Sequence, residues 1–481
     1  MCTFCFDNID INEETLSGYG TTHTVNGIIV QPKVPTCLTK PSPAKRMKVT
    51  TRSIQPQNTQ ILPFTLGKRP SPGHLSTVDL AKSMSHSIDA MQADTLWFLT
   101  RFVHGENLDG STDSEQVVPG WTAFNAMMTS NNVPPQSNIG YLPMIDGSAT
   151  QHNTVYTLLS QAVTMAKELN LQDAIIVVDQ AIYAKAVDIV WKEKEVFKNV
   201  VLRLGAFHTS MTFMSVIGKR FADAGLLELL VNSCIVAPAS AAAVLDGKHY
   251  NRSIRAHKLI VEALLRVRWA AFVEWLQTKP FTGIDTTRLT SDIRQVRQTL
   301  HLDDILVVAN SVSFKGICSL YDQFCQTPNG PMAEYWNSYI GMVQLLLRFI
   351  RSTKEGNWQL HFECIRQMAP WMFAYDRTNY SRYLPLYWCE MMALPRTHPQ
   401  AYQHLNSGEF GSQRSKSNGF SKTPIDKTIE ETINKATKTK GRGIIGKSLN
   451  KGAVLKWTTT SHERAAIMTS CRIAAGKYPY K

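Results

Sequence analysis

The chain has 481 residues, of which 43% are hydrophobic and 19% are charged, and its formal net charge is +13. This composition excludes a wholly disordered protein, a collagen and a small disulfide-rich scaffold, because those classes need fewer apolar residues, periodic glycine or dense cysteine. A single hydrophobic core stops growing at roughly 250–300 residues, so the length predicts more than one domain, and the positive charge favours nucleic acid or another acidic surface as the partner.

Residues 1–31 are predicted to form a β-hairpin that opens an α/β core. Residues 4–6 and 24–30 are apolar or β-branched runs typical of strands, and Gly18 and Gly20 favour a turn between them. The chain therefore begins its core with two strands in succession.

Residues 32–75 are rich in proline, serine, threonine and glutamine. They are predicted to be a mobile linker or a long excursion, because they cannot bury enough apolar surface to offset their chain entropy. The basic cluster at 43–48 is either a nuclear import signal or part of a solvated linker. Scattered cysteines and the lack of a signal peptide in the first residues predict an intracellular protein with reduced thiols.

Residues 76–223 are predicted to complete the α/β core. We expect a helix over 78–103, a loop over 113–146, and a helix that Asn153 caps and that ends near Leu169.

The strongest α/β signal lies within this region. The runs 174–179 and 200–204 are continuous and apolar, and helical segments at 181–192 and 207–221 follow them. This alternation indicates a parallel pair of strands in an α/β layer.

Residues 224–400 are predicted to form a helical domain with a dense aromatic block. The apolar stretch 224–245 is interrupted by polar residues and by Pro238, so it indicates two buried helices with a turn and not a membrane span. The tryptophans at 358, 371 and 388 either belong to the core or anchor a protein-interaction scaffold.

Residues 401–481 form a basic C-terminal segment with predicted helices at 425–436 and 461–475. From residue 405 onward the segment carries ten of the thirteen net positive charges. The candidate nucleic-acid-binding residues are Lys435, Lys438, Lys440, Arg442, Lys447 and Lys451.

Residues 441–448 fit the pattern of a phosphate-binding loop. Such a loop needs a buried strand before it and a helix after it, whereas here a polar cationic run precedes it and Gly452 disfavours a following helix. We therefore favour a glycine-rich basic loop that contacts a phosphate backbone.

Carboxylates at strand ends suggest metal chemistry. Asp7 closes the first predicted strand, Asp179 closes the best buried strand, and Glu430 or Glu431 on a late helix supplies a third acid. Acids of this kind can hold Mg²⁺ for phosphoryl transfer. The alternatives are that Asp179 caps the next helix and that Asp7 is an ordinary strand-end residue.

The choice of the third acid stays open, and one further side chain, His208, belongs to this hypothesis. Glu430 and Glu431 point about 100° apart on a helix, so the sequence does not choose between them. His208 follows the strand 200–204 at a predicted helix start, where it either faces the same cleft or is a plain helix-start histidine.

Several segments resemble an uncharacterised multicopy protein family associated with mobile elements. They are residues 8–31, 178–180, 204–208, 376–385 and 425–446. The architecture of that family is similar to DDE transposases, which implies an α/β plus all-α fold that is mainly helical, with a ribonuclease H-like core interrupted by a large helical domain. DNA is the implied partner. The assignment of Asp7, Asp179 and Glu430 to the three acidic positions is inferred from chain order and local pattern.

Other functions stay open. The chain begins almost on its first strand, with no zinc finger or helix-turn-helix before it, so a fragment or an inactive copy of a transposase is one expectation. A nucleic-acid-binding protein without catalysis and a protein-interaction scaffold are the others.

Overall fold

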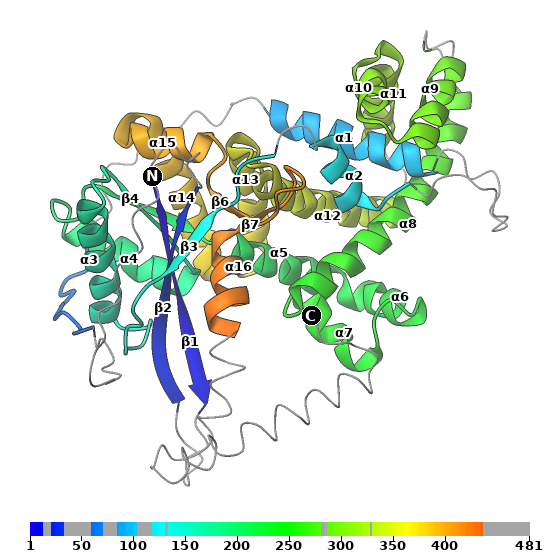
Figure 1. Ribbon diagram of the computed structural model, residues 1–481. Coiled ribbons are helices and arrows are strands. Elements are labelled where there is room, and N and C mark those ends of the chain that lie inside the picture. Colours follow the sequence, from blue (N-terminus) through cyan, green and yellow to red (C-terminus); the bar gives the residue numbers. More distant parts are fainter. Residues whose placement is uncertain are drawn as a thin grey trace, which may run out of the picture.

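In the computed structural model, the described residues are 1–12, 21–32, 59–70, 84–102, 118–129, 133–279, 284, 286–327 and 330–435. Across these residues the protein is mainly helical and has a small mixed sheet (Figure 1). The predicted combination of an α/β part with an all-helical part is therefore confirmed.

Five strands form the mixed sheet, in the spatial order β3-β2-β1-β4-β5. They are β1 (Thr3–Asn12), β2 (Thr21–Gln31), β3 (Asn138–Tyr141), β4 (Ala174–Val178) and β5 (Val200–Leu204). β2 is antiparallel to both neighbours, whereas β1, β4 and β5 are parallel. The predicted hairpin and parallel pair are confirmed. β3 lies where a loop was predicted, because four residues that include a glycine give a weak strand pattern.

Helices build the rest of the described chain. In the first half they are α1 (Ser85–Phe102), α2 (Trp121–Met128), α3 (His152–Glu168), α4 (Gln180–Lys192) and α5 (Ala206–Phe221). From residue 222 they are η1 (Ala222–Ala224), α6 (Leu226–Asn232), α7 (Pro238–Leu245), α8 (Tyr250–Gln277), α9 (Thr286–Thr299), α10 (Leu302–Asn310), α11 (Val312–Gln326), α12 (Pro331–Glu355), α13 (Trp358–Ala374), α14 (Thr378–Thr397) and α15 (Pro399–Asn406). The predicted helical domain is thus helical in its described part, including the break before Pro238. None of the described helices is long and apolar enough to cross a membrane.

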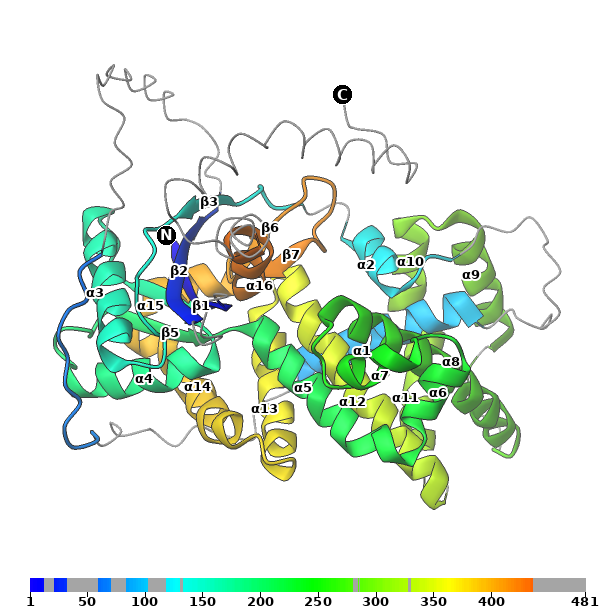
Figure 2. The same cartoon turned by 90° about the horizontal axis from the view of Figure 1, so that it is seen from below.

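Side chains alternate between the two faces of β1. Phe4 and Phe6 pack into the main core with residues of α3 and α4, whereas Cys5 packs on the opposite face with Ile425 and Ile429. These two isoleucines belong to α16 (Ile425–Ile429), which lies on one side of the sheet while α3 and α4 lie on the other (Figures 1 and 2). Asp7 has the same parity as Cys5, so it belongs to the face that α16 covers.

The C-terminal part of the described chain folds back onto the sheet. Its elements are β6 (Gly411–Gln413), β7 (Lys422–Pro424), α16 (Ile425–Ile429) and the π-helical turn η2 (Glu430–Asn434). The hairpin of β6 and β7 was not predicted, whereas α16 and η2 together confirm the helix expected from residue 425. The second expected helix at 461–475, the loop pattern at 441–448 and the basic cluster at 43–48 lie outside the described residues.

One part of the predicted linker is packed against the α/β part. Within 59–70, the Leu62 amide donates to Thr157 Oγ1 at 2.9 Å, and the ring of Phe64 stacks on that of Tyr156 with centroids 4.9 Å apart. These residues therefore fit the long-excursion alternative, because their few apolar side chains find partners on α3.

The first helix also departs from the predicted division. α1 packs against α13 and α9 of the helical part, although residues 76–223 were assigned to the α/β core. The buried Arg351 of α12 fixes this arrangement, because it donates to Asp94 of α1 at 2.8 Å and to Asn125 of α2. The periodicity of a single segment cannot predict such a contact between helices that lie far apart in the chain.

Candidate metal centre

The strand register brings two of the predicted acids to the same level of the sheet. Phe6 of β1 pairs with Val178 of β4, and this is the last pair of the parallel ladder. Asp7 and Asp179 follow directly, on strands that lie about 4.8 Å apart. The prediction that Asp7 closes its strand is wrong, since β1 continues to Asn12 along β2. The pairing of β1 with β4 ends at Phe6, directly before Asp7.

Asp179 caps the helix that follows it. Its Oδ1 accepts a hydrogen bond from the Ile182 amide at 2.8 Å, so the capping interpretation of this acid is confirmed. Asp179 also lines a cavity of about 340 Å³ together with His208, Arg377 and Tyr380. Arg377 and Tyr380 come from the segment 376–385, to which the sequence analysis gave no chemical role.

Asp426 holds the start of α5, and the sequence analysis missed it. Its Oδ2 accepts hydrogen bonds from the amides of Phe207 and His208 at 2.9 and 3.1 Å, and it lies 3.2 Å from His208 Nδ1. A helix N-terminus has unpaired amides and favours negative charge. Asp426 lies four residues before Glu430, so helical spacing places both acids on one face. The spacing of four residues between Asp426 and Glu430 is the sequence feature that could have indicated Asp426 as part of the site.

Gly205 permits this close approach. A Cβ atom on Gly205 would lie 2.2 Å from Asp426 Oδ2. The chain therefore needs glycine where β5 turns into α5, because any side chain there would push the Asp426 carboxylate away from the helix start.

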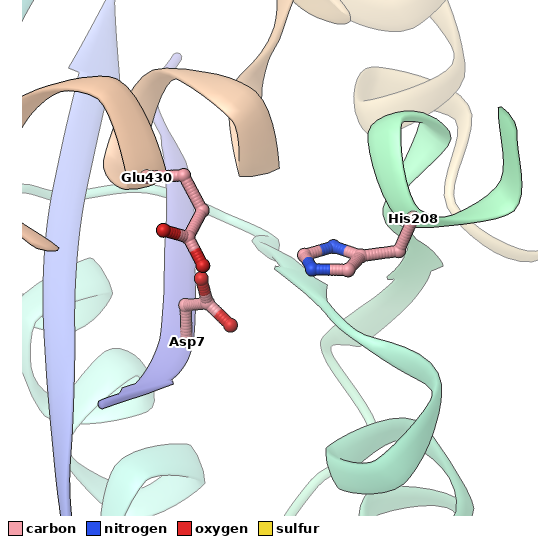
Figure 3. A group of neighbouring side chains, drawn as sticks. All are labelled: Asp7, His208 and Glu430. Atoms are coloured by element: carbon pink, nitrogen blue, oxygen red, sulfur yellow. The ribbon is translucent and has the colours of Figure 1, made fainter. Parts of the chain in front are cut away.

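Asp7, His208 and Glu430 converge from three elements. Each offers a ligand atom, and these atoms lie within 4.8 Å of one another. Figure 3 shows the Glu430 carboxylate directed at that of Asp7, with the His208 ring facing both. Because His208 Nδ1 meets Asp426, Nε2 is the ring nitrogen left for this pair of acids. The predicted meeting of β1, a late helix and the start of α5 is thus present in the structure.

Asp7 is held by a short amide chain. It is only 1% exposed, and its Oδ2 accepts a hydrogen bond from Asn434 Nδ2 at 3.0 Å. Asn434 Oδ1 accepts in turn from Asn26 Nδ2 at 2.7 Å. Asp7 Oδ1 is buried without a hydrogen-bond partner among the described residues. This oxygen is therefore available to a cation or a proton.

The charges at the centre shift its pKa values. Burial raises the pKa of Asp7 well above its ordinary value, Glu430 and Asp179 act in the same direction, and His208 opposes them. Burial alone would lower the pKa of His208, but the hydrogen bond and charge of Asp426, with Asp7 and Asp179, raise it to about 9. Without a metal the centre therefore retains protons near neutral pH, as expected where buried acids crowd together.

Glu431, the neighbour of Glu430 in the chain, has other partners. Glu431 forms ion pairs with Arg414 at 2.7 Å and with Lys427 at 3.0 Å, so it is not part of the cluster and Glu430 is the inward-facing residue. Lys435 is exposed at the end of the described chain. The other predicted nucleic-acid-binding residues, which lie outside the described residues, are Lys438, Lys440, Arg442, Lys447 and Lys451.

Residues 120–478 match a domain of unknown function, DUF8702, and the chain belongs to this family. The matched span contains Asp179, His208, Asp426 and Glu430, whereas Asp7 precedes it. Comparisons with curated proteins and with solved structures gave no match.

Proposed function

We propose that this protein is a transposase-like, metal-dependent phosphoryl-transfer enzyme that acts on DNA and has a ribonuclease H-like core. The observation that carries the proposal is the meeting of Asp7 and Glu430, beside Asp179, although the three acids come from opposite parts of the chain. The strand order β3-β2-β1-β4-β5, with only β2 antiparallel to its neighbours, supports a ribonuclease H-like core. The large helical part between β5 and α16 fits the interruption expected of such a transposase.

The residues present suit a divalent cation. Asp7 Oδ1 is a buried carboxyl oxygen without a hydrogen bond among the described residues, and the Glu430 carboxylate faces Asp7. Two acids this close need a shared proton or a cation between them. Asp7 and Glu430 would hold the ion, with His208 Nε2 as the third ligand. Carboxylates suit both Mg²⁺ and Mn²⁺.

A bound divalent cation would supply the positive charge that activates a water and stabilises the phosphoryl oxygens. The residues of the chain have separate tasks around it. Asp426 orients the His208 ring by meeting Nδ1, as carboxylates do for metal-binding histidines. Arg377 lines the adjoining cavity together with Asp179 and His208, so its guanidinium would pair with a phosphate oxygen bound there.

Substitution of the two acids tests the proposal. With labelled DNA and Mg²⁺ or Mn²⁺, we expect the wild-type chain to nick or join strands, and Asp7→Asn and Glu430→Gln to lose activity by at least about 100-fold, because loss of even an outer partner of a metal ligand costs 10–100-fold. Glu431→Gln is the matched control, since it removes the same group one residue away. Absence of activity from the wild type, or equal activity in Glu430→Gln, would reject the enzyme.

A DNA-binding protein without catalysis is the second candidate. The observation that favours it is the capping bond of Asp179 to α4, which occupies one oxygen of the second predicted metal-binding acid. Under this alternative, the chain binds DNA with a steep dependence on salt, and its DNA products are unchanged by any divalent metal.

A further inference from the structure

A basic cavity lies where the helical part meets the start of α5 and α16. It has a volume of about 310 Å³ and is lined from α2, α5, α8, α12, β7 and α16. Five cationic side chains line it, and no acid does so among the described residues that form its wall. The five are Arg255, Lys258, Lys354, Lys422 and Lys427. We call this cavity the basic pocket.

Aromatic rings and neutral oxygens hold several of these cations in place. Lys258 Nζ donates to Thr122 Oγ1 at 2.7 Å and lies 4.5 Å from the ring centre of Trp121. Lys354 Nζ lies 5.4 Å from the ring centre of Phe420. Ring faces attract cations without neutralising them, so the positive charge remains available to a ligand.

The crowding of like charges has a cost that an anion would remove. Burial, and then the charge of Lys354, lower the pKa of Lys258 to about 8. Burial, and then the charges of Lys427 and Arg414, lower the pKa of Lys354 to about 8 as well. An anion bound among these ammonium groups would receive charge-assisted hydrogen bonds and relieve their mutual repulsion.

The basic pocket adjoins the metal centre. Ala206 and Ser210 of α5 line it, and His208 lies between them in the chain. The ring of Tyr250, which also lines the pocket, contacts that of Phe207 at 4.8 Å, and Phe207 contacts His208 at 5.0 Å between ring centroids. One helical turn rises about 5.4 Å, so pocket and centre are next to each other along α5.

We propose that the basic pocket binds a phosphate group of the nucleic-acid strand whose neighbouring phosphodiester lies at the metal centre. This inference rests on the proposed function for the position of the strand. The cationic and hydroxyl groups that line the pocket suit a tetrahedral anion. Lys427 pairs with Glu431 at 3.0 Å and Lys422 with Glu409 at 3.8 Å, so we assign the anion mainly to Lys258, Lys354 and Arg255. A free phosphorylated small molecule has the same chemistry, and the experiment separates the two sources.

The test measures binding of a labelled single-stranded oligonucleotide to the full chain in a metal-free buffer, over a range of salt. We expect Lys258→Gln/Lys354→Gln to weaken binding by at least about 10-fold and to reduce the slope of log affinity against log salt by about 1.5, because each lost phosphate contact removes about 0.7 from that slope for single strands. The control Arg294→Gln/Lys315→Gln removes two exposed cations from α9 and α11 and is expected to bind within about twofold of wild type. Equal losses in the two variants would overturn the proposal.

A second variant and a second ligand complete the design. Arg255 is exposed at the pocket, so Arg255→Gln preserves the fold if the double variant does not, and we expect it to weaken binding about threefold. Pyrophosphate is expected to compete with the oligonucleotide in wild type. If the pocket variants lose pyrophosphate but bind the oligonucleotide normally, the pocket serves a small phosphorylated ligand and the strand proposal is wrong.

The readout is independent of catalysis. A chain that shows pocket-dependent binding without any cleavage would reject the proposed enzyme and retain the strand contact. A chain that cleaves DNA while its pocket variants bind and cleave normally would reject the pocket alone.

Discussion

Asp426 links the electrostatics of the centre to the geometry of a helix start. Its carboxylate accepts two backbone amides of α5 and meets His208 Nδ1, so one buried charge orients the ring and supports its protonated form. His208 could be predicted from its position after a strand, and Glu430 from its position on a late helix. Sequence reasoning missed Asp426, because an acid at the first turn of a helix ordinarily serves that helix and not one that lies about 220 residues earlier.

The substitution Asp426→Asn isolates this charge. We expect the pKa of His208 to fall below about 9, because the largest opposing influence to burial is the bond and charge of Asp426. The unfolding free energy should fall by about 2 kcal/mol, since hydrogen bonds to a charged group contribute about 1.5–3 kcal/mol. Histidine NMR titration and denaturant unfolding measure the two effects. An unchanged His208 pKa in Asp426→Asn would show that the Asp426 carboxylate is not the partner of His208. The control variant is Glu431→Gln.

The contact between α5 and α16 depends on the missing side chain of Gly205. We expect Gly205→Ala to destabilise the protein by about 1–3 kcal/mol, because a Cβ would lie 2.2 Å from Asp426 Oδ2 and overpacking of this kind costs that amount. Denaturant unfolding measures the loss. Gly341→Ala on α12 is the matched control, since nothing lies within 4 Å of its Cβ, and we expect that variant to be neutral or slightly stabilised. Equal stability of Gly205→Ala and wild type would contradict this geometry.

Helices α8 and α12 meet at a buried histidine. His257 Nδ1 lies 2.9 Å from Tyr339 Oη, and burial lowers the pKa of His257 to about 4. The folded chain therefore binds this proton less readily than the unfolded chain, whose histidine titrates near 6.5. The stability that His257 contributes is present above pH 6.5 and is lost as the pH falls toward 4.

We expect this group alone to account for about 3 kcal/mol of lost stability between pH 6.5 and pH 4, from the usual conversion of a pKa difference to free energy. The difference between wild type and His257→Gln should therefore shrink by that amount over this range in urea unfolding. His301→Gln, which alters an exposed histidine, should run parallel to wild type. Parallel curves for His257→Gln as well would show that the imidazole already carries its proton.

At the scale of the whole molecule, the sequence predicts more of the fold than of the site. Periodicity and apolar runs can be recognised within short segments of sequence. The opening hairpin, the parallel strand pair and the helices of the helical part could therefore be predicted from them. The packing of α1 on the helical part and of residues 59–70 on α3 depends on partners such as Arg351 and Thr157, which lie far away in the chain. The candidate site was predictable where strand ends mark it, at Asp179 and His208. The supports Asn26, Asn434 and Asp426 become visible only when distant segments are brought together.

The bond between Asn434 and Asp7 joins residues 427 positions apart. A ribosome adds roughly 5–20 residues per second, so the hairpin leaves the exit tunnel roughly 20–90 s before its partner helix is made. During that time the face of β1 and β2 that carries Cys5, Ile28 and Val30 lacks the isoleucines of α16 that later cover it. A nascent chain of this design therefore leaves an apolar strand face uncovered for most of its synthesis.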